Sequence, residues 1–453
     1  MKSVNRKKKT HSVRSHWTTF FGGNMKDQNH VQLRHLRGLA VFGVVMMLGV
    51  ACGGSDSASI ETNAPATTDG SVTSDPVENA SNRDGQTIKV GVVNNDSLLP
   101  AFRIGAEVAI AAINAGGGIN GAQIEVVLCA ADASPEGSIN CANQMIEENV
   151  AIAYTALDLG SDAAIPIYDE AGIPYITTNG WGTVQESNAN SFILHAASSA
   201  SFLGPLKTFK DLGLTKVGYV TDVNFAGTPY EAKLKNYAEI LGLEVTPIYL
   251  DPASPDWTSA VANFKSQGIE AITGFLGEIQ CIGLVSATTA VGFEGAVFAS
   301  SCNLYLDVVP DLAVGTYNQA DIWTTLAYDE APAEVQARLD EYSANMTAGG
   351  HEALISGFAH VSYGGWMELR EILSAIPNDQ EVNGESVKAT IVSQVFPGYF
   401  GPDLHCGKAL WADSPSACHA SIAVFQIEKA ADGRLIRKLY SDFADNSALV
   451  GGE

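Results

Sequence analysis

The side chains with the clearest capacity for chemistry are six cysteines that form three sequence-local pairs. The pairs are separated by 12, 21 and 12 residues: Cys129 with Cys141, Cys281 with Cys302, and Cys406 with Cys418. An even set at short spacings is typical of disulfides in exported proteins, and pairing between neighbours is the simplest connectivity. His405 and His419 flank the last pair, so a zinc site of two cysteines and two histidines is the alternative. We predict disulfides, because an exported chain meets an oxidising compartment.

A glycine-rich segment over residues 116–121 has the spacing G-x-G-x-x-G of a dinucleotide-binding fingerprint. That fingerprint must follow a strand and open a helix, so that the helix N-terminus meets the pyrophosphate. Here a predicted helix over 101–115 precedes the glycines and a predicted strand over 124–128 follows them. We interpret the segment as a helix C-cap and turn, and we predict no cofactor.

Catalytic motifs are missing from the sequence, which has no G-x-S-x-G, H-E-x-x-H or P-loop pattern. Its nine histidines are scattered, and we expect structural roles for His195, His351 and His360. A catalytic set assembled from distant residues is the alternative, so a secreted hydrolase is the less favoured function. We predict that the protein is not an enzyme.

An apolar run over residues 39–51 leads to Cys52 and follows a basic stretch. This order is typical of an export signal, and a core of about 14 residues is shorter than the ~20 that a membrane helix needs. A cysteine directly after the cut resembles the bacterial lipoprotein signal, which implies removal of 1–51 and lipidation of Cys52. The alternatives are a secreted protein or an uncleaved anchor, and Met25 is an alternative start.

The charge excludes nucleic acid as a partner. The whole chain carries −24, and the first 51 residues hold nine basic side chains and one acidic one, so the chain from Cys52 carries about −32. Nucleic-acid binding needs Lys and Arg to meet phosphate. Residues 52–86 are rich in Ser, Thr, Asn, Asp and Ala, which cannot bury a core, and we expect a flexible tether there.

From residue 87 the sequence alternates signals for strands and helices, which is typical of parallel, doubly wound sheets. Strands are expected over 88–93, 124–128, 151–154, 173–177, 216–220, 243–250, 271–275 and 296–299, with helices over 101–115, 138–148, 163–171, 229–241, 257–267 and 279–291. Two such runs meet near residues 192–201. The fold class is therefore α/β, with two parallel-sheet lobes joined by a hinge.

Three segments carry a resemblance to a known family: 113–121, 167–176 and 192–220. Their order and spacing resemble the type I periplasmic solute-binding proteins, in the leucine/isoleucine/valine-binding branch, over about 87–440. The resemblance implies an extracytoplasmic receptor of an ABC importer whose two lobes close on a small solute. It implies a first lobe from 87–196 plus about 323–400, and a second from 197–322 plus about 401–445.

The resemblance also implies the site residues of the first lobe, which follow its strands. Asn95 and Asp96 come after the first strand, Asp158 and Ser161 after the third, and Asn179 and Trp181 after the fourth. In the family the third loop holds the ligand carboxylate, which Asp158 would repel unless it meets an ammonium. The alternatives are that Asp158 caps the next helix and that Trp181 packs between the lobes.

In the second lobe the resemblance implies Phe225, Glu278 and Ser300 as contacts. Phe225 could instead be core packing, and Glu278 could be a first-turn helix acid rather than an ammonium partner. Family members that bind amino acids place an acid where this chain has Ser300 and Ser301. The solute is therefore either an α-amino acid whose ammonium group meets Glu278 or Asp158 instead, or an amide, a small acid or an aromatic compound.

The resulting prediction is a lipid-anchored, monomeric, extracytoplasmic receptor without a metal or other cofactor. It would be attached to the membrane through Cys52 and deliver a small polar solute to an ABC transporter. A sensor of the same fold that acts on a signalling partner is the alternative.

Overall fold

The computed structural model describes residues 83–96 and 99–452. Its first lobe contains a parallel five-stranded sheet in the order β2-β1-β3-β4-β5. The strands are β1 (Thr87–Asn94), β2 (Gln123–Ala130), β3 (Ile152–Thr155), β4 (Tyr175–Gly180) and β5 (Ser191–Ala197). The inner strands β1 and β3 are mostly buried, as expected for a parallel sheet covered on both faces.

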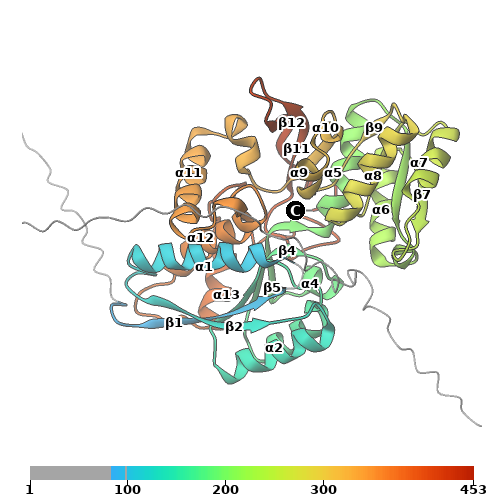
Figure 1. The fold of residues 1–453 in the computed structure, drawn as a ribbon. Coiled ribbons are helices and arrows are strands. Elements are labelled where there is room, and N and C mark those ends of the chain that lie inside the picture. The colour runs from blue at the N-terminus through green and yellow to red at the C-terminus, as the bar shows by residue number, and fades with distance from the viewer. Residues whose placement is uncertain (1–82, 97–98, 453) are drawn as a thin grey trace, which may run out of the picture. The chain divides into compact units, whose positions relative to one another are not determined.

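Helices connect the strands of this sheet and cover it. They are α1 (Pro100–Ala115), α2 (Pro135–Glu147), α3 (Ser161–Glu170) and the short α4 (Thr183–Ser187). Figure 1 shows α1 on one side of β1 and β2 and α2 on the other. The helix α1 has Pro100 at its first turn, where a missing N–H costs nothing, and ends before Gly116. The sequence did not lead us to expect α4.

The second lobe contains a parallel four-stranded sheet in the order β7-β6-β8-β9. Its strands are β6 (Lys216–Asp222), β7 (Glu244–Leu250), β8 (Ala271–Gly274) and β9 (Ala296–Val297). The helices α5 (Ser198–Asp211), α6 (Pro229–Leu241), α7 (Trp257–Ser266) and α8 (Glu278–Val291) accompany them, with a 3-10 turn η1 (Val223–Phe225) after β6. The predicted fold class is confirmed.

The chain after residue 299 has structure that our sequence interpretation did not assign. It contains α9 (Leu304–Val308), α10 (Pro310–Ala313), η2 (Thr325–Glu330), α11 (Ala333–Ala348), η3 (Glu352–Leu354), α12 (Ala359–Ser374) and α13 (Gly384–Ser393). An antiparallel sheet β10-β11-β12 is formed by Tyr317–Ala320, Ser421–Lys429 and Leu435–Asp445. The helix α12 packs closely on α1, where a Cβ at Gly105 would lie 2.1 Å from the carbonyl oxygen of Ala359.

The core is divided in the same way as the sheets. One buried cluster joins the strands of the first lobe to α11 and α12, and two others lie around the second sheet. The segments that cross between the lobes are β5 to α5, the stretch after β10, and the loop that leads into β11. The backbone of Ile193 pairs with Ala417, which ties the first crossing to the third.

The three predicted disulfides are confirmed, with neighbouring cysteines bonded in each pair. The bond between Cys406 and Cys418 occupies both sulfur atoms that the alternative zinc site would need as ligands. The glycine-rich segment is a turn after α1, in which Gly117, Gly118 and Gly121 have positive φ and the Gly118 N–H donates to the Ile113 carbonyl. Cys52, Met25 and residues 52–82 of the expected tether lie outside the described residues. The tether was wrongly extended to residue 86, because Arg83 is buried and donates to the Pro377 carbonyl at 2.8 Å.

Candidate functional site

Loops at the carboxyl ends of the parallel strands form the candidate site, because ligands of open α/β sheets bind at that edge. In the first lobe these are the loops after β1, β3 and β4, and in the second they are the loops after β6, β8 and β9. The residues that the resemblance implied lie on these loops. Their hydrogen bonds show which of them already have partners within the chain.

Asn95 and Asp96, which follow β1, both have partners within the first lobe. The Asn95 side chain donates to the Leu157 carbonyl at 2.8 Å and accepts from the Ala133 N–H at 2.8 Å. Asp96 forms an ion pair with Arg103 of α1, with 3.0 Å between carboxylate and guanidinium. Asn95 thus joins three loops, and Asp96 joins its loop to α1.

Asp158 lies under its loop rather than on its surface, with 1% of the residue exposed. Its carboxylate accepts from the Ser138 hydroxyl at 2.7 Å and from the Gly160 N–H at 3.0 Å. Burial raises the pKa of Asp158. Its second oxygen and the Ser161 hydroxyl are buried without partners among the described residues, as are the hydroxyls of two nearby tyrosines, Tyr168 and Tyr175. The loop after β3 therefore covers a buried polar cluster.

The loop after β4 places a tryptophan toward the second lobe. Asn179 holds the loop by donating to the Ala156 carbonyl at 3.2 Å, and the Trp181 N–H donates to the Gln185 side chain at 2.8 Å. The Trp181 ring lies 5.0 Å from that of Phe275, which follows β8, and 6.3 Å from that of Tyr230 in α6. The ring contact between these residues joins the two lobes.

Phe225 lies beneath this contact, in the second lobe. It is 2% exposed, and its ring centroid is 5.6 Å from that of Phe275 and 6.0 Å from that of Phe202. Trp181 and Phe225, both chosen from the sequence, thus contact the same ring. Tyr230 and Phe275 were not chosen, although Phe275 is the last residue of a predicted strand, and this position at a strand end is the signal that could have identified it.

Glu278 begins α8 and supports the start of α9. Its carboxylate accepts from the backbone N–H groups of Asn303 at 3.0 Å and Leu304 at 2.6 Å, and burial raises its pKa. Ser300 has a positive φ of 51°, and its carbonyl accepts from the Gln319 N–H at 3.1 Å. These contacts connect the loop after β9 to α8 and to β10.

A second contact between the lobes is polar and buried. Lys233 of α6 donates to Glu186 of α4 at 2.6 Å, with 10% and 1% of their side chains exposed. The same ammonium reaches three hydroxyls, at 3.2, 3.0 and 2.9 Å, which belong to Ser198, Ser199 and Ser414. We call these five residues the lysine cluster. Burial raises the pKa of Glu186, and the charge of Lys233 opposes that shift.

Buried titratable groups also line the crossings. His195 of β5 lies 2.7 Å from the Glu368 carboxylate of α12. The carboxyl of Asp321 in the second crossing is buried, which raises its pKa to about 6, and burial lowers the pKa of His419 in the third crossing to about 3. Sequence analysis named His195 and His419 but neither Glu368 nor Asp321, because the groups that line the crossings come from distant segments.

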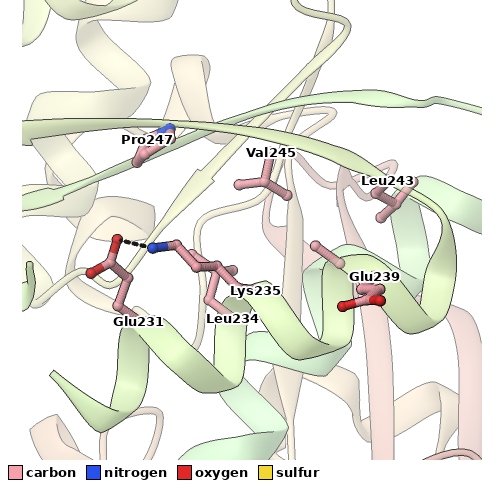
Figure 2. Close-up of a pocket in the computed structure, with 8 residues that line it drawn as sticks. Glu231, Leu234, Lys235, Glu239, Leu243, Val245 and Pro247 are labelled. Atoms are coloured by element: carbon pink, nitrogen blue, oxygen red, sulfur yellow. Dashed lines mark ion pairs between the residues drawn. The ribbon is translucent and has the colours of Figure 1, made fainter. Parts of the chain in front are cut away.

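A groove lies elsewhere, between α6 and β7 of the second lobe (Figure 2). It measures about 240 Å³ and lies along the helix that carries Glu231, Leu234 and Lys235, opposite Val245 and Pro247. No residue that the sequence suggested lines it. We therefore place the candidate site at the ring contact and not in this groove.

Comparisons with known proteins identify the family and the fold. A family model described as periplasmic binding protein matches residues 87–425. A leucine-, isoleucine-, valine-, threonine- and alanine-binding protein of Pseudomonas aeruginosa is 23% identical over 178 residues, which are 38% of this chain and 47% of that relative. The chain thus spans about half the length of the curated relative that it matches.

Solved structures of similar fold cover most of the chain. An ABC transporter substrate-binding protein from Sphaerobacter thermophilus has a TM-score of 0.67 at 19% identity, covering 80% of this chain and 100% of that one. A solute-binding protein from R. palustris in complex with 4-hydroxybenzoate scores 0.65 at 20% identity, covering 80% and 98%. A branched-chain amino acid transporter protein from Streptococcus pneumoniae, in complex with isoleucine, scores 0.62 at 19% identity, covering 78% and 99%.

Proposed function

Because the chain belongs to the type I periplasmic binding protein family, we propose that it captures a small organic solute between its two lobes and delivers it to an ABC importer. The family consists of solute-binding proteins and not enzymes, and it acts outside the cytoplasm. The observation that carries the proposal is the ring contact of Trp181 with Tyr230 and Phe275, because it joins the strand ends of both lobes at the edge where such folds bind ligands.

The ligands of relatives with this fold support a proposal for the size and the chemistry of the solute. One relative was solved in complex with isoleucine and another with 4-hydroxybenzoate, which are both small molecules with a carboxylate. We propose a solute of this size, either an amino acid or a related amide or acid. A solute bound at micromolar affinity supplies about 8 kcal/mol, which exceeds the few kcal/mol that separate the two states of a typical clamp.

We also propose attachment to the membrane through lipid on Cys52, with the folded part monomeric. The basic and apolar residues before Cys52 support this proposal. Within the described residues no helix is both long and apolar enough to cross a bilayer. Growth of cells on labelled palmitate tests the anchor: the wild-type chain should carry label, and a Cys52→Ala variant should carry none. Label retained by Cys52→Ala would refute lipidation at this residue.

The capture of a solute is tested by thermal unfolding and X-ray scattering of the purified chain with a panel of amino acids, amides and organic acids. A solute that binds the native state raises the melting temperature, and closure of two lobes lowers the radius of gyration. We expect one chemical class to do both, with one solute bound per chain. If no member of the panel changes either quantity, solute capture is wrong.

A further inference from the structure

We propose that the solute is a planar aromatic compound with hydrogen-bond acceptors and no ammonium group, and that Trp181, Tyr230 and Phe275 select it. This inference rests on the proposed function and specifies the class of solute. Two independent features of the site carry it. One is the arrangement of its aromatic rings. The other is that the carboxylates beside these rings already have partners within the protein.

The rings form an inner and an outer set. Phe202, Tyr219 and Phe225 are at most 2% exposed and form the inner set, whereas Trp181, Tyr230 and Phe275 are only half-buried. Phe275 joins the two sets, because its plane lies within 23° of that of Phe202 and within 19° of that of Tyr230. The outer rings therefore extend an existing stack toward the space between the lobes.

Trp181 closes this stack from the other lobe. Its ring meets Phe275 at an interplanar angle of 61° and Tyr230 at 67°, in edge-on contacts. A planar ring inserted here exchanges these contacts for equivalent aromatic ones, which are worth about 0.5–1.5 kcal/mol each beyond the buried area. A tetrahedral ammonium head needs the rings to separate further than a flat solute does.

The carboxylates beside the rings are engaged by groups of the protein itself. Burial raises the pKa of Tyr230, Glu186 and Asp162 lie close enough for their charges to raise it further, and Glu231 is its neighbour in the chain. Glu186 pairs with Lys233, Asp162 accepts from the backbone N–H groups of Val184 and Gln185, and Glu231 pairs with Lys235. An ammonium group would need a carboxylate that is free to pair with it, because a desolvated cation without a partner is costly.

Donors, by contrast, are available beside the rings. The amide nitrogen of Gln185 is buried without a partner, although its oxygen accepts from the Trp181 N–H. Among the described residues, no hydrogen bond is formed by the Tyr230 hydroxyl or the Trp181 indole N–H. Unpartnered donors favour a solute with acceptor atoms, such as a carboxylate, a carbonyl or a phenolic oxygen.

The test uses pairs of compounds that differ in one feature, measured by calorimetry on the full-length chain. The compounds 3-phenylpropanoate and L-phenylalanine differ in the ammonium group, and benzoate and cyclohexanecarboxylate differ in aromaticity. We expect 3-phenylpropanoate or benzoate to bind at least tenfold more tightly than its partner. Trp181→Leu and Phe275→Leu should each weaken that binding about tenfold. Phe293→Leu, which changes a half-buried ring just after α8 in the same lobe, should leave it within twofold.

Several outcomes would overturn the inference. Failure of both aromatic acids to bind at millimolar concentration would do so, and so would tighter binding of L-phenylalanine, L-leucine or choline. Binding of one of these three would leave the receptor function intact while refuting the solute class. If amino acid binding is lost in Asp321→Asn, that buried carboxyl of the second crossing is the ammonium partner. Absence of binding by every compound of the larger panel would refute the proposed function itself.

Discussion

Two contacts join α4 and its loop to the second lobe, and they differ in their physics. The lysine cluster is polar and nearly sealed from solvent, and Lys233 has four acceptors for its three protons. The ring contact of Trp181 is apolar and half-exposed. A buried, satisfied polar set tolerates little displacement, whereas rings in contact can part and meet again at small cost. The lysine cluster therefore fixes the junction, and the ring contact is the part that a solute can enter.

The largest expected effect comes from breaking the lysine cluster. Lys233→Met leaves Glu186 as a buried carboxylate without a cation and should lower the free energy of unfolding by about 3–5 kcal/mol. Urea unfolding followed by circular dichroism measures it. Lys207→Met, which breaks the exposed pair with Asp211, is the control and should cost less than ~1 kcal/mol. Equal losses in the two variants would contradict the role of the cluster.

The next largest expected effect is a loss of folding stability at acidic pH, which His419 in the third crossing should cause. Burial lowers the pKa of His419 to about 3, so the unfolded chain takes up a proton below pH 6.5 that the folded chain does not. Stability should therefore fall as the pH drops from 6.5 toward 4.5, by about 3 kcal/mol from this residue. Urea midpoints at pH 7 and 4.5 should differ less in His419→Gln than in wild type. His351→Gln, at a half-exposed position, should leave the difference unchanged.

The ring contact should contribute less to stability than the lysine cluster does. Trp181→Leu removes two edge-on ring contacts and leaves the lobes joined by Lys233, so we expect a loss of about 1–2 kcal/mol in the free energy of unfolding. The same variant should lose about tenfold in solute affinity. A loss of stability as large as that of Lys233→Met would show that the rings also fix the junction.

Glu278→Gln should have the smallest effect and distinguishes the two roles that the sequence left open. The Glu278 carboxylate accepts hydrogen bonds from the first backbone N–H groups of α9, and this role should contribute about 1 kcal/mol to the free energy of unfolding. The amide keeps one acceptor, so the loss of stability should be about that size or less and solute affinity should change less than twofold. A large loss of affinity at unchanged stability would instead support an ammonium partner at this position.

Much of the fold was predictable because its signals are local. Val90 and Val92 in β1, or Ile272 in β8, lie in short apolar runs between helical segments, and such alternation is typical of parallel sheets. Asp158 shows the limit of this approach. Its position after β3 was correct, but the direction of its side chain, toward Ser138 of α2, depends on a helix from another part of the chain.

The sequence alone determined the alternating strands and helices, the family resemblance and the pairing of neighbouring cysteines, because each depends on residues that lie close together along the chain. The tertiary structure decided which distant side chains meet. Lys233 reaches Ser414 across 181 positions, and Trp181 contacts Phe275 from the other lobe. Such contacts depend on how two separately folded sheets face each other, and no local pattern of residues encodes that geometry.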